Sequence, residues 1–163
     1  LLENAFSKKD LEIGMKVVKS GQITMSSNTI NFEKNFAKKN QSNYALMVNS
    51  GSSANLLSVA VACNPMRNSY LKKNDEVIIP AVCWSTSLWP LIQYGLKPVF
   101  VDIDLSTLNI NIDDLISKIT KKTKAIMCVH ILGLSSNMKK IKKKCREKKL
   151  TLFEDTCESA GAR

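Results

Sequence analysis

The sequence has 163 residues, of which 44% are hydrophobic and 23% are charged, and its formal net charge is +10. This length allows one hydrophobic core, and the composition is that of an ordinary globular protein and not of a disordered one. No apolar run approaches the length of a membrane span, and the N-terminus lacks the organisation of a signal peptide. Because the first residue is leucine, we expect the chain to be an excerpt of a longer protein.

Residues 1–43 are predicted to form a helical lead-in, and residues 44–163 the main domain. Amphipathic patterns predict one helix around Leu11–Val18 and a second near Phe32–Lys39. The predicted strands are then 44–48, 76–80, 98–103, 124–129 and 150–154, and the predicted helices are 52–63, 85–94, 112–119 and 137–148. No hairpin signals separate the strands, so we expect a three-layer α/β fold with a mostly parallel sheet and helices on both faces.

The basic residues are concentrated late in the chain, where Lys118–Lys149 contains 12 of the 24 lysines and arginines. Met138, Ile141 and Cys145 form a narrow apolar stripe, and lysines take most of the remaining positions. This pattern predicts a surface helix on a sheet, with its N-cap among residues 135–137. A nucleic-acid surface is the alternative, although no aromatic residues interleave with the lysines and no recognition motif accompanies them.

The cysteines indicate neither a disulfide framework nor a metal site. Their number is odd and no two have C-x-x-C spacing; they are Cys63, Cys83, Cys128, Cys145 and Cys157. We expect unpaired thiols in a reducing cytoplasm, and no metal site.

Polar residues follow the predicted strands at their carboxyl ends, where ligands bind in parallel α/β sheets. They are Asn49–Ser53, Cys83–Thr86, Asp102–Asp104, His130 and Asp155–Glu158. We predict that these segments converge at one edge of the sheet and form the mouth of a cofactor site.

The stretch "NSGSSAN" has the features of a phosphate-binding loop. Gly51 allows a sharp turn and a close approach to a ligand, and Ser52 and Ser53 then open a helix with free N–H groups. The stretch matches neither the dinucleotide-binding glycine pattern nor the Walker pattern. A plain serine N-cap is the alternative.

In "FEDTCESAG" an apolar strand ends in carboxylates. A carboxylate at Asp155 could pair with a protonated heterocyclic nitrogen, Glu158 could reach a ring hydroxyl, and Trp84 could stack on the ring. Together with a phosphate cup, these groups suit pyridoxal 5'-phosphate, whose pyridine nitrogen must stay protonated. Helix capping after the strand is the alternative for Asp155 and Glu158.

Three stretches carry a family resemblance: "MVNSGSSANLLSVA", "LKKNDEVIIPAVCWSTSLWPLIQYGLKPVFVDIDLSTLNI" and "FEDTCESAGA". They resemble the DegT/DnrJ/EryC1/StrS sugar aminotransferase and dehydratase family of fold-type-I pyridoxal-phosphate enzymes. The resemblance runs from about Gly21 to Gly161 and implies the large domain of that fold, incomplete at its C-terminal side. It also implies that Ser52 and Ser53 bind the phosphate, that Trp84 stacks on the ring and that Asp155 holds the pyridine nitrogen.

Within the family, the resemblance favours the branch of nucleotide-sugar 3-dehydratases. Glu158 stands where most sugar aminotransferases carry Gln, and "PAVCWSTS" is also typical of this branch. "HILGLSSN", with His130, is more similar to the aminotransferases, so that branch stays the alternative. The expected reaction is C3 deoxygenation of a nucleotide-linked 4-keto-6-deoxy sugar in deoxysugar or lipopolysaccharide biosynthesis. The implied partners are pyridoxal or pyridoxamine 5'-phosphate, glutamate as amino donor, and a second subunit in a cytoplasmic homodimer, without nucleic acid or membrane.

The resemblance places the family's reacting Lys or His beyond Arg163, so no catalytic residue is assigned and the chain alone is expected to be inactive. His130 is expected to line the pocket or contact substrate. Two further hypotheses for the chain are a non-catalytic homologue that keeps the fold and a basic nucleic-acid-binding module.

Overall fold

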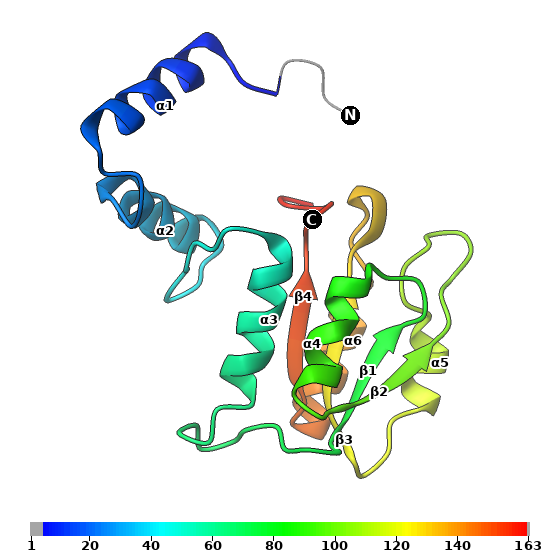
Figure 1. The fold of residues 1–163 in the computed structure, drawn as a ribbon. Coiled ribbons are helices and arrows are strands. Elements are labelled where there is room, and N and C mark those ends of the chain that lie inside the picture. The colour runs from blue at the N-terminus through cyan, green and yellow to red at the C-terminus, as the bar shows by residue number, and fades with distance from the viewer. Residues whose placement is uncertain (1–4, 163) are drawn as a thin grey trace. The chain divides into compact units, whose positions relative to one another are not determined.

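The computed structural model describes residues 5–162, which form two compact units that divide between Val48 and Asn49. The first unit contains α1 (Lys8–Ser20) and α2 (Ser27–Lys39), and the second contains the sheet and the other helices (Figure 1). Both helices predicted in the lead-in are therefore confirmed, with longer bounds than the sequence pattern indicated. No helix among residues 5–162 has the length and apolar character needed to cross a membrane.

Local sequence accounts for the bounds of α1. The Ser7 hydroxyl accepts a hydrogen bond from the Asp10 N–H at 3.2 Å, and the Ser7 N–H donates to the Asp10 carboxylate at 2.9 Å. This capping box begins the helix, and Gly21, with a left-handed φ of 71°, ends it. No residue of α1 is buried.

The strand predicted at 44–48 is absent, so this prediction was wrong. Tyr44 and Leu46 are exposed, at 90% and 66%, and the Met47 N–H donates to the Glu33 carboxylate at 2.7 Å. An apolar run becomes a strand only when a neighbouring strand takes up its backbone hydrogen bonds. Within residues 5–162 no strand pairs with this segment.

The other four predicted strands are confirmed, and they form one parallel sheet. They are β1 (Glu76–Pro80), β2 (Lys97–Val101), β3 (Thr123–Val129) and β4 (Thr151–Asp155), in the order β2-β1-β3-β4. β1 is buried along its whole length, as expected for its apolar residues Val77–Pro80, and the buried Glu76 carboxylate at its start accepts the Thr120 hydroxyl at 2.6 Å. The register of β3 and β4 sets Asp155 beside Val129 at their carboxyl ends.

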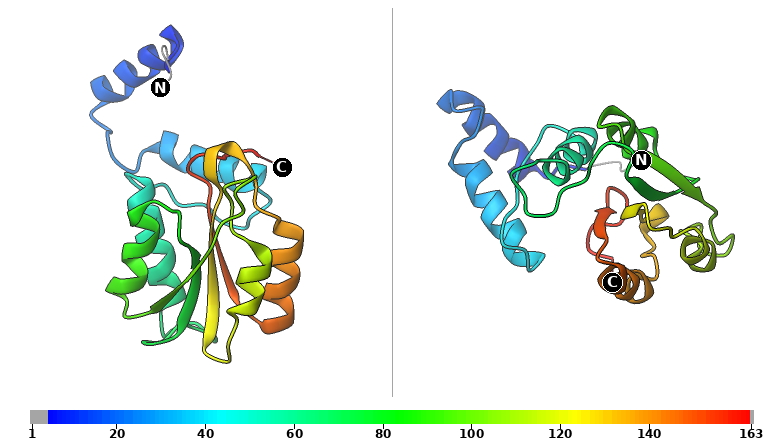
Figure 2. Two further views of the ribbon diagram at one scale, coloured as in Figure 1. Left: turned by 90° about the vertical axis from the view of Figure 1, so that its right-hand side faces the viewer. Right: turned by 90° about the horizontal axis from the view of Figure 1, so that it is seen from below.

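Helices cover both faces of this sheet, as predicted (Figure 2). On one face lie α3 (Gly51–Ala62) and α4 (Ser85–Gln93), and on the other lie α5 (Ile112–Ser117) and α6 (Met138–Lys148). Successive residues of β1 point to opposite faces, so Val77 and Ile79 belong to one core and Ile78 to the other. The fold is therefore a three-layer α/β arrangement.

The lysine-rich helix α6 follows the predicted pattern. Asn137 is its N-cap and accepts the Lys140 N–H at 3.2 Å. Ile141 and Cys145 are buried, and Met138 packs against the same core. The lysines on the remaining faces of the helix are mostly exposed to solvent.

Candidate functional site

A cavity of about 530 Å³ lies at the carboxyl ends of β1, β3 and β4, within the second unit. Five of the six residues predicted to bind a cofactor line it: Gly51, Ser52, Trp84, Asp155 and Glu158. Cys83, Thr86, His130 and Cys157 also line it, and Val82, Val129 and Ile131 supply apolar walls. The segments that follow β1, β3 and β4 therefore converge as expected.

The N-terminus of α3 opens toward this cavity. The N-cap is Ser50, whose hydroxyl accepts the Ser53 N–H at 3.2 Å and donates to the Ser53 hydroxyl at 3.2 Å. The helix thus begins at Gly51, one residue earlier than predicted. The N–H groups of Gly51 and Ser52 lie in the first turn, where a helix has no internal acceptors and carries partial positive charge. Ser53 does not line the cavity, so its role as a phosphate ligand stays a prediction.

The structure gives Gly51 a packing role in addition to the close approach to a ligand that the sequence predicts. Its backbone is helical rather than left-handed. A Cβ atom at this position would lie 2.9 Å from the Cys157 Sγ atom, closer than Cβ contacts normally occur. The thiol of Cys157 therefore packs directly against Gly51 at the edge of the cavity.

Asp155 ends β4 and is 8% exposed, and three donors hold its carboxylate. Asn55 Nδ2 and the Ser87 hydroxyl each donate to Oδ2 at 2.8 Å, and the Cys157 N–H donates to Oδ1 at 3.2 Å. Burial alone would raise the pKa of Asp155, but the hydrogen bonds from Asn55, Cys157 and Ser87 outweigh it and hold the pKa below its ordinary value. The carboxylate therefore stays ionised near neutral pH, facing the cavity.

The sequence interpretation missed Asn55 and Ser87. Asn55 lies one turn into α3, and Ser87, which is fully buried, lies in the first turn of α4. A polar residue within the apolar stretch "ANLLSVAVA" was the available signal for Asn55. The helix-capping alternative for Asp155 and Glu158 does not hold, because residues 157–161 form a turn rather than a helix.

Trp84 and Glu158 lie on the rim of the cavity. Trp84 is the N-cap residue of α4, is 74% exposed and lines the cavity. Glu158 is exposed, and its Oε2 accepts the Leu132 N–H at 2.7 Å. Leu132, with a left-handed φ of 53°, belongs to the short 3-10 helix Ile131–Gly133 that follows β3. Glu158 thus joins the segment after β4 to the segment after β3.

The hydrogen bonds of Cys157 and His130 limit the chemistry of both side chains. The hydrogen bond to Asp155, followed by burial, raises the pKa of the Cys157 thiol to about 11, so the thiol stays protonated. His130 is 4% exposed, and its Nδ1 accepts the Ser136 N–H at 3.2 Å. The other ring nitrogen, Nε2, is therefore the donor, and it lies 3.5 Å from Glu154 Oε2. His130 lines the cavity as expected, with both ring nitrogens facing protein groups.

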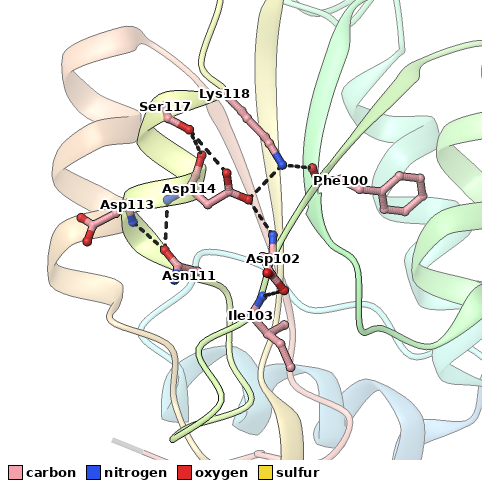
Figure 3. Close-up of polar contacts among 8 residues, drawn as sticks. All are labelled: Phe100, Asp102, Ile103, Asn111, Asp113, Asp114, Ser117 and Lys118. Atoms are coloured by element: carbon pink, nitrogen blue, oxygen red, sulfur yellow. Dashed lines mark hydrogen bonds and ion pairs between the residues drawn. The ribbon is translucent and has the colours of Figure 1, made fainter.

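The segment after β2 does not line the cavity, so the prediction that Asp102–Asp104 contributes to the mouth was wrong. Its first residue, Asp102, makes a polar contact with α5 instead (Figure 3). β2 is at the edge of the sheet, and the residues at its end form hydrogen bonds with Asp114 of α5 and with Lys118 directly after it. Asp114 Oδ2 accepts the Asp102 N–H at 2.7 Å and pairs with Lys118 Nζ at 2.9 Å. Lys118 also donates to the Phe100 carbonyl at 2.9 Å. The backbone hydrogen bond from Asp102, then the hydrogen bond from Lys118, holds the pKa of Asp114 below its ordinary value.

The chain matches the DegT/DnrJ/EryC1/StrS aminotransferase family over residues 5–163. It is 44% identical over 163 residues to the GDP-4-keto-6-deoxy-D-mannose 3-dehydratase of Yersinia pseudotuberculosis, which covers 100% of this chain and 41% of that relative. It is 48% identical over 146 residues to the protein of the same name from Escherichia coli O55:H7, with coverage of 90% and 37%.

The solved structures lead to the same group of proteins. The E. coli GDP-4-keto-6-deoxy-D-mannose-3-dehydratase with bound hydrated PLP matches with a TM-score of 0.93 at 44% identity, over 100% of this chain and 42% of that chain. The chain thus spans about two fifths of the length of the relatives that it matches.

Proposed function

Since the chain belongs to the DegT/DnrJ/EryC1/StrS aminotransferase family, we propose that it forms the cofactor-binding part of a pyridoxal-phosphate-dependent nucleotide-sugar 3-dehydratase. The observation that carries this proposal is the composition of one cavity. A helix N-terminus, an exposed indole ring and an ionised carboxylate all line it. Its volume of about 530 Å³ falls within the usual range for small-molecule sites.

The residues present fit pyridoxal or pyridoxamine 5'-phosphate. The N–H groups of Gly51 and Ser52, with the Ser52 hydroxyl, would hold the phosphate at the positive end of α3. Ser53 is proposed to assist from the same turn. Trp84 would stack on the ring, and Asp155 would hold the pyridine nitrogen. We assign no catalytic residue within this chain.

When bound, the cofactor supplies an electron sink for negative charge that develops beside its ring. Asp155 serves this chemistry by keeping a proton on the pyridine nitrogen, because an ionised carboxylate stabilises the protonated ring. Asn55 and Ser87 orient that carboxylate by donating to the same oxygen, each at 2.8 Å. Glu158 Oε1 makes no hydrogen bond within residues 5–162 and is the oxygen available to the ring hydroxyl.

The proposed substrate is a nucleotide-linked 4-keto-6-deoxy sugar, which loses its C3 hydroxyl with glutamate as the amino donor, in deoxysugar or lipopolysaccharide biosynthesis. The two curated relatives of this chain, whose names state a 3-dehydratase acting on a GDP-linked keto sugar, support this choice. A nucleotide-sugar aminotransferase is the second candidate. His130, in the stretch "HILGLSSN" that is typical of that branch, favours it.

We also propose that the protein works as a cytoplasmic homodimer. The five cysteines are unpaired, in keeping with a reducing compartment. α1 buries none of its residues and exposes Leu11, Met15 and Val18 at 56%, 55% and 69%. An apolar surface of this kind is typical of a helix that packs against a second subunit.

The test is to incubate the whole protein with a GDP-linked 4-keto-6-deoxyhexose, pyridoxal phosphate and glutamate, and to measure product masses. We expect a 3-deoxy product. Asp155→Ala should reduce turnover on the order of 100-fold or more, because the ring nitrogen loses its charged partner. Asp113→Ala removes an exposed carboxylate that does not line the cavity, and its turnover should match that of the unmodified protein.

The outcomes separate the candidates. A product mass that matches the 4-amino sugar would assign the protein to the aminotransferase branch. Unchanged turnover in Asp155→Ala would exclude the role given to that carboxylate. Failure of the protein to bind pyridoxal phosphate at all would contradict both candidate functions.

A further inference from the structure

A second cavity, of about 520 Å³, lies at the opposite end of the sheet. Its lining includes Lys124 near the start of β3, Thr151 at the start of β4 and Asp75 directly before β1. The loop that joins α3 to β1 and the C-terminal end of α6 complete the wall. Because the candidate cofactor site lies at the carboxyl ends of the same strands, the two cavities are separate.

The lining of this second cavity is strongly basic. It contains four lysines but only one carboxylate; the lysines are Lys72, Lys124, Lys148 and Lys149. The carboxylate, Asp75, already accepts the Lys72 N–H at 2.8 Å. In the part of the chain that the structure describes, none of the four ammonium groups forms an ion pair, whereas other lysines of the same unit do.

The only partners of these four ammonium groups within residues 5–162 are uncharged. Lys124 Nζ donates to the Lys121 carbonyl at 3.2 Å, and Lys72 Nζ lies 5.2 Å from the centroid of the Tyr70 ring. Four cationic residues that line one hollow repel one another, and a bound anion would relieve that repulsion.

Lys149 provides a second, independent observation. It ends α6 in the left-handed conformation, with φ 54° and ψ 44°. Glycine or asparagine is the usual residue at such a position, because in other residues the Cβ atom comes too close to the backbone carbonyl oxygen. Backbone strain of this kind is frequent at binding sites, and Lys149 lies directly beside Lys148 in the cavity lining.

We propose that this cavity binds a small ligand that carries a diphosphate group. The ammonium groups would neutralise the diphosphate, and the hydroxyls of Ser69, Tyr70 and Thr151, which also line the cavity, would donate to its oxygens. The cavity has the size of a small-molecule site. A compact hollow suits a diphosphate better than an extended nucleic acid, which requires a continuous basic groove or stacking platforms.

The test is isothermal titration of the whole protein at low ionic strength with inorganic pyrophosphate and, separately, with adenosine diphosphate. Lys124→Gln/Lys149→Gln should weaken binding about tenfold or more, because each substitution removes a charge-assisted contact. Lys139→Gln/Lys140→Gln is the matched control. This control also removes two positive charges, but from residues of α6 that do not line the cavity, and it should weaken binding less than about twofold.

The two ligands identify the recognised group. Equal affinities would show that the diphosphate alone is bound, and tighter binding of adenosine diphosphate would add the nucleoside to the recognised unit; both results support the proposal. Saturating pyridoxal phosphate should leave pyrophosphate binding unchanged.

Three results would overturn the proposal. The first is equal weakening of binding by both double substitutions, which would indicate that the anion is attracted by the general positive charge of the protein and not by this cavity. The second is displacement of pyrophosphate by pyridoxal phosphate, which would place the anion at the N-terminus of α3. The third is that neither ligand binds.

Discussion

Asp155 combines burial with ionisation, and its stability contribution should therefore depend on pH. Its pKa in the folded protein is lower than the ordinary value, so the contribution is complete above the unfolded pKa of about 4 and is lost as pH falls through the folded pKa. Asp155→Asn should destabilise the protein by about 1–3 kcal/mol at pH 7, since an amide cannot accept all three hydrogen bonds. Urea denaturation at pH 7 and pH 3 should show this difference shrinking in acid.

Asp113→Asn is the control for this prediction. Asp113 is exposed, in the first turn of α5, and its carboxylate makes no hydrogen bond within residues 5–162. Its loss should cost at most about 1 kcal/mol, through the helix dipole. A stability difference for Asp155→Asn that stays constant from pH 7 to pH 3 would contradict the assignment of a lowered pKa.

At the scale of the element, helix α4 has an N-cap residue, Trp84, whose side chain cannot accept a capping hydrogen bond. The backbone of Trp84 is extended, and its side chain makes no capping hydrogen bond. Asparagine at this position could accept a free N–H of the first turn, and little burial would be lost because Trp84 is 74% exposed. Trp84→Asn should therefore raise the free energy of unfolding by about 0.5–1 kcal/mol while it weakens binding of pyridoxal phosphate.

Trp89 offers the matched comparison, because it is also an exposed tryptophan of α4, at 54%, but lies inside the helix. Trp89→Asn should lower the free energy of unfolding, since asparagine stabilises a helix at the N-cap but has a low helix propensity inside it. Denaturation and cofactor titration of both variants check the prediction. Tight cofactor binding by Trp84→Asn would remove the stacking role from the proposal.

The sequence predicts an element well when local pattern and tertiary context agree. β1 and α6 lie close to their predicted bounds, because the apolar residues of each segment have the spacing of the element that they form. Asp155 and Trp84 could be predicted to line the cavity because one lies at the carboxyl end of a strand and the other shortly after such an end. The contacts of Asn55 and Ser87 with Asp155 could not be predicted, because they depend on the packing of α3 and α4 against the sheet; the polar position of Asn55 in an apolar helix was the only signal. The segment 44–48 failed as a strand because its pattern says nothing about whether a partner strand is present.

At the scale of the whole molecule, the strand order predicts which backbone amides are best protected from hydrogen exchange. β1 and β3 each have two neighbours, whereas β2 lies at an edge and is partly exposed. Amides of β1 and β3 should therefore exchange with deuterium most slowly, and those of β2 distinctly faster. Hydrogen-exchange mass spectrometry of the whole protein measures this directly. Protection of β2 equal to that of β1 would show that another segment covers that edge.

The hydrogen bonds to Asp155 join residues that are synthesised at different times. Asn55 and Ser87 precede it by 100 and 68 residues. At a synthesis rate of about 5–20 residues per second, Asn55 is made roughly 5–20 s before the carboxylate that it holds. Until β4 is made, the N-terminus of α3 and the indole of Trp84 exist without the group proposed to hold the pyridine nitrogen. A nascent chain could therefore meet the phosphate of the cofactor early but could retain its ring only after β4 has joined the sheet.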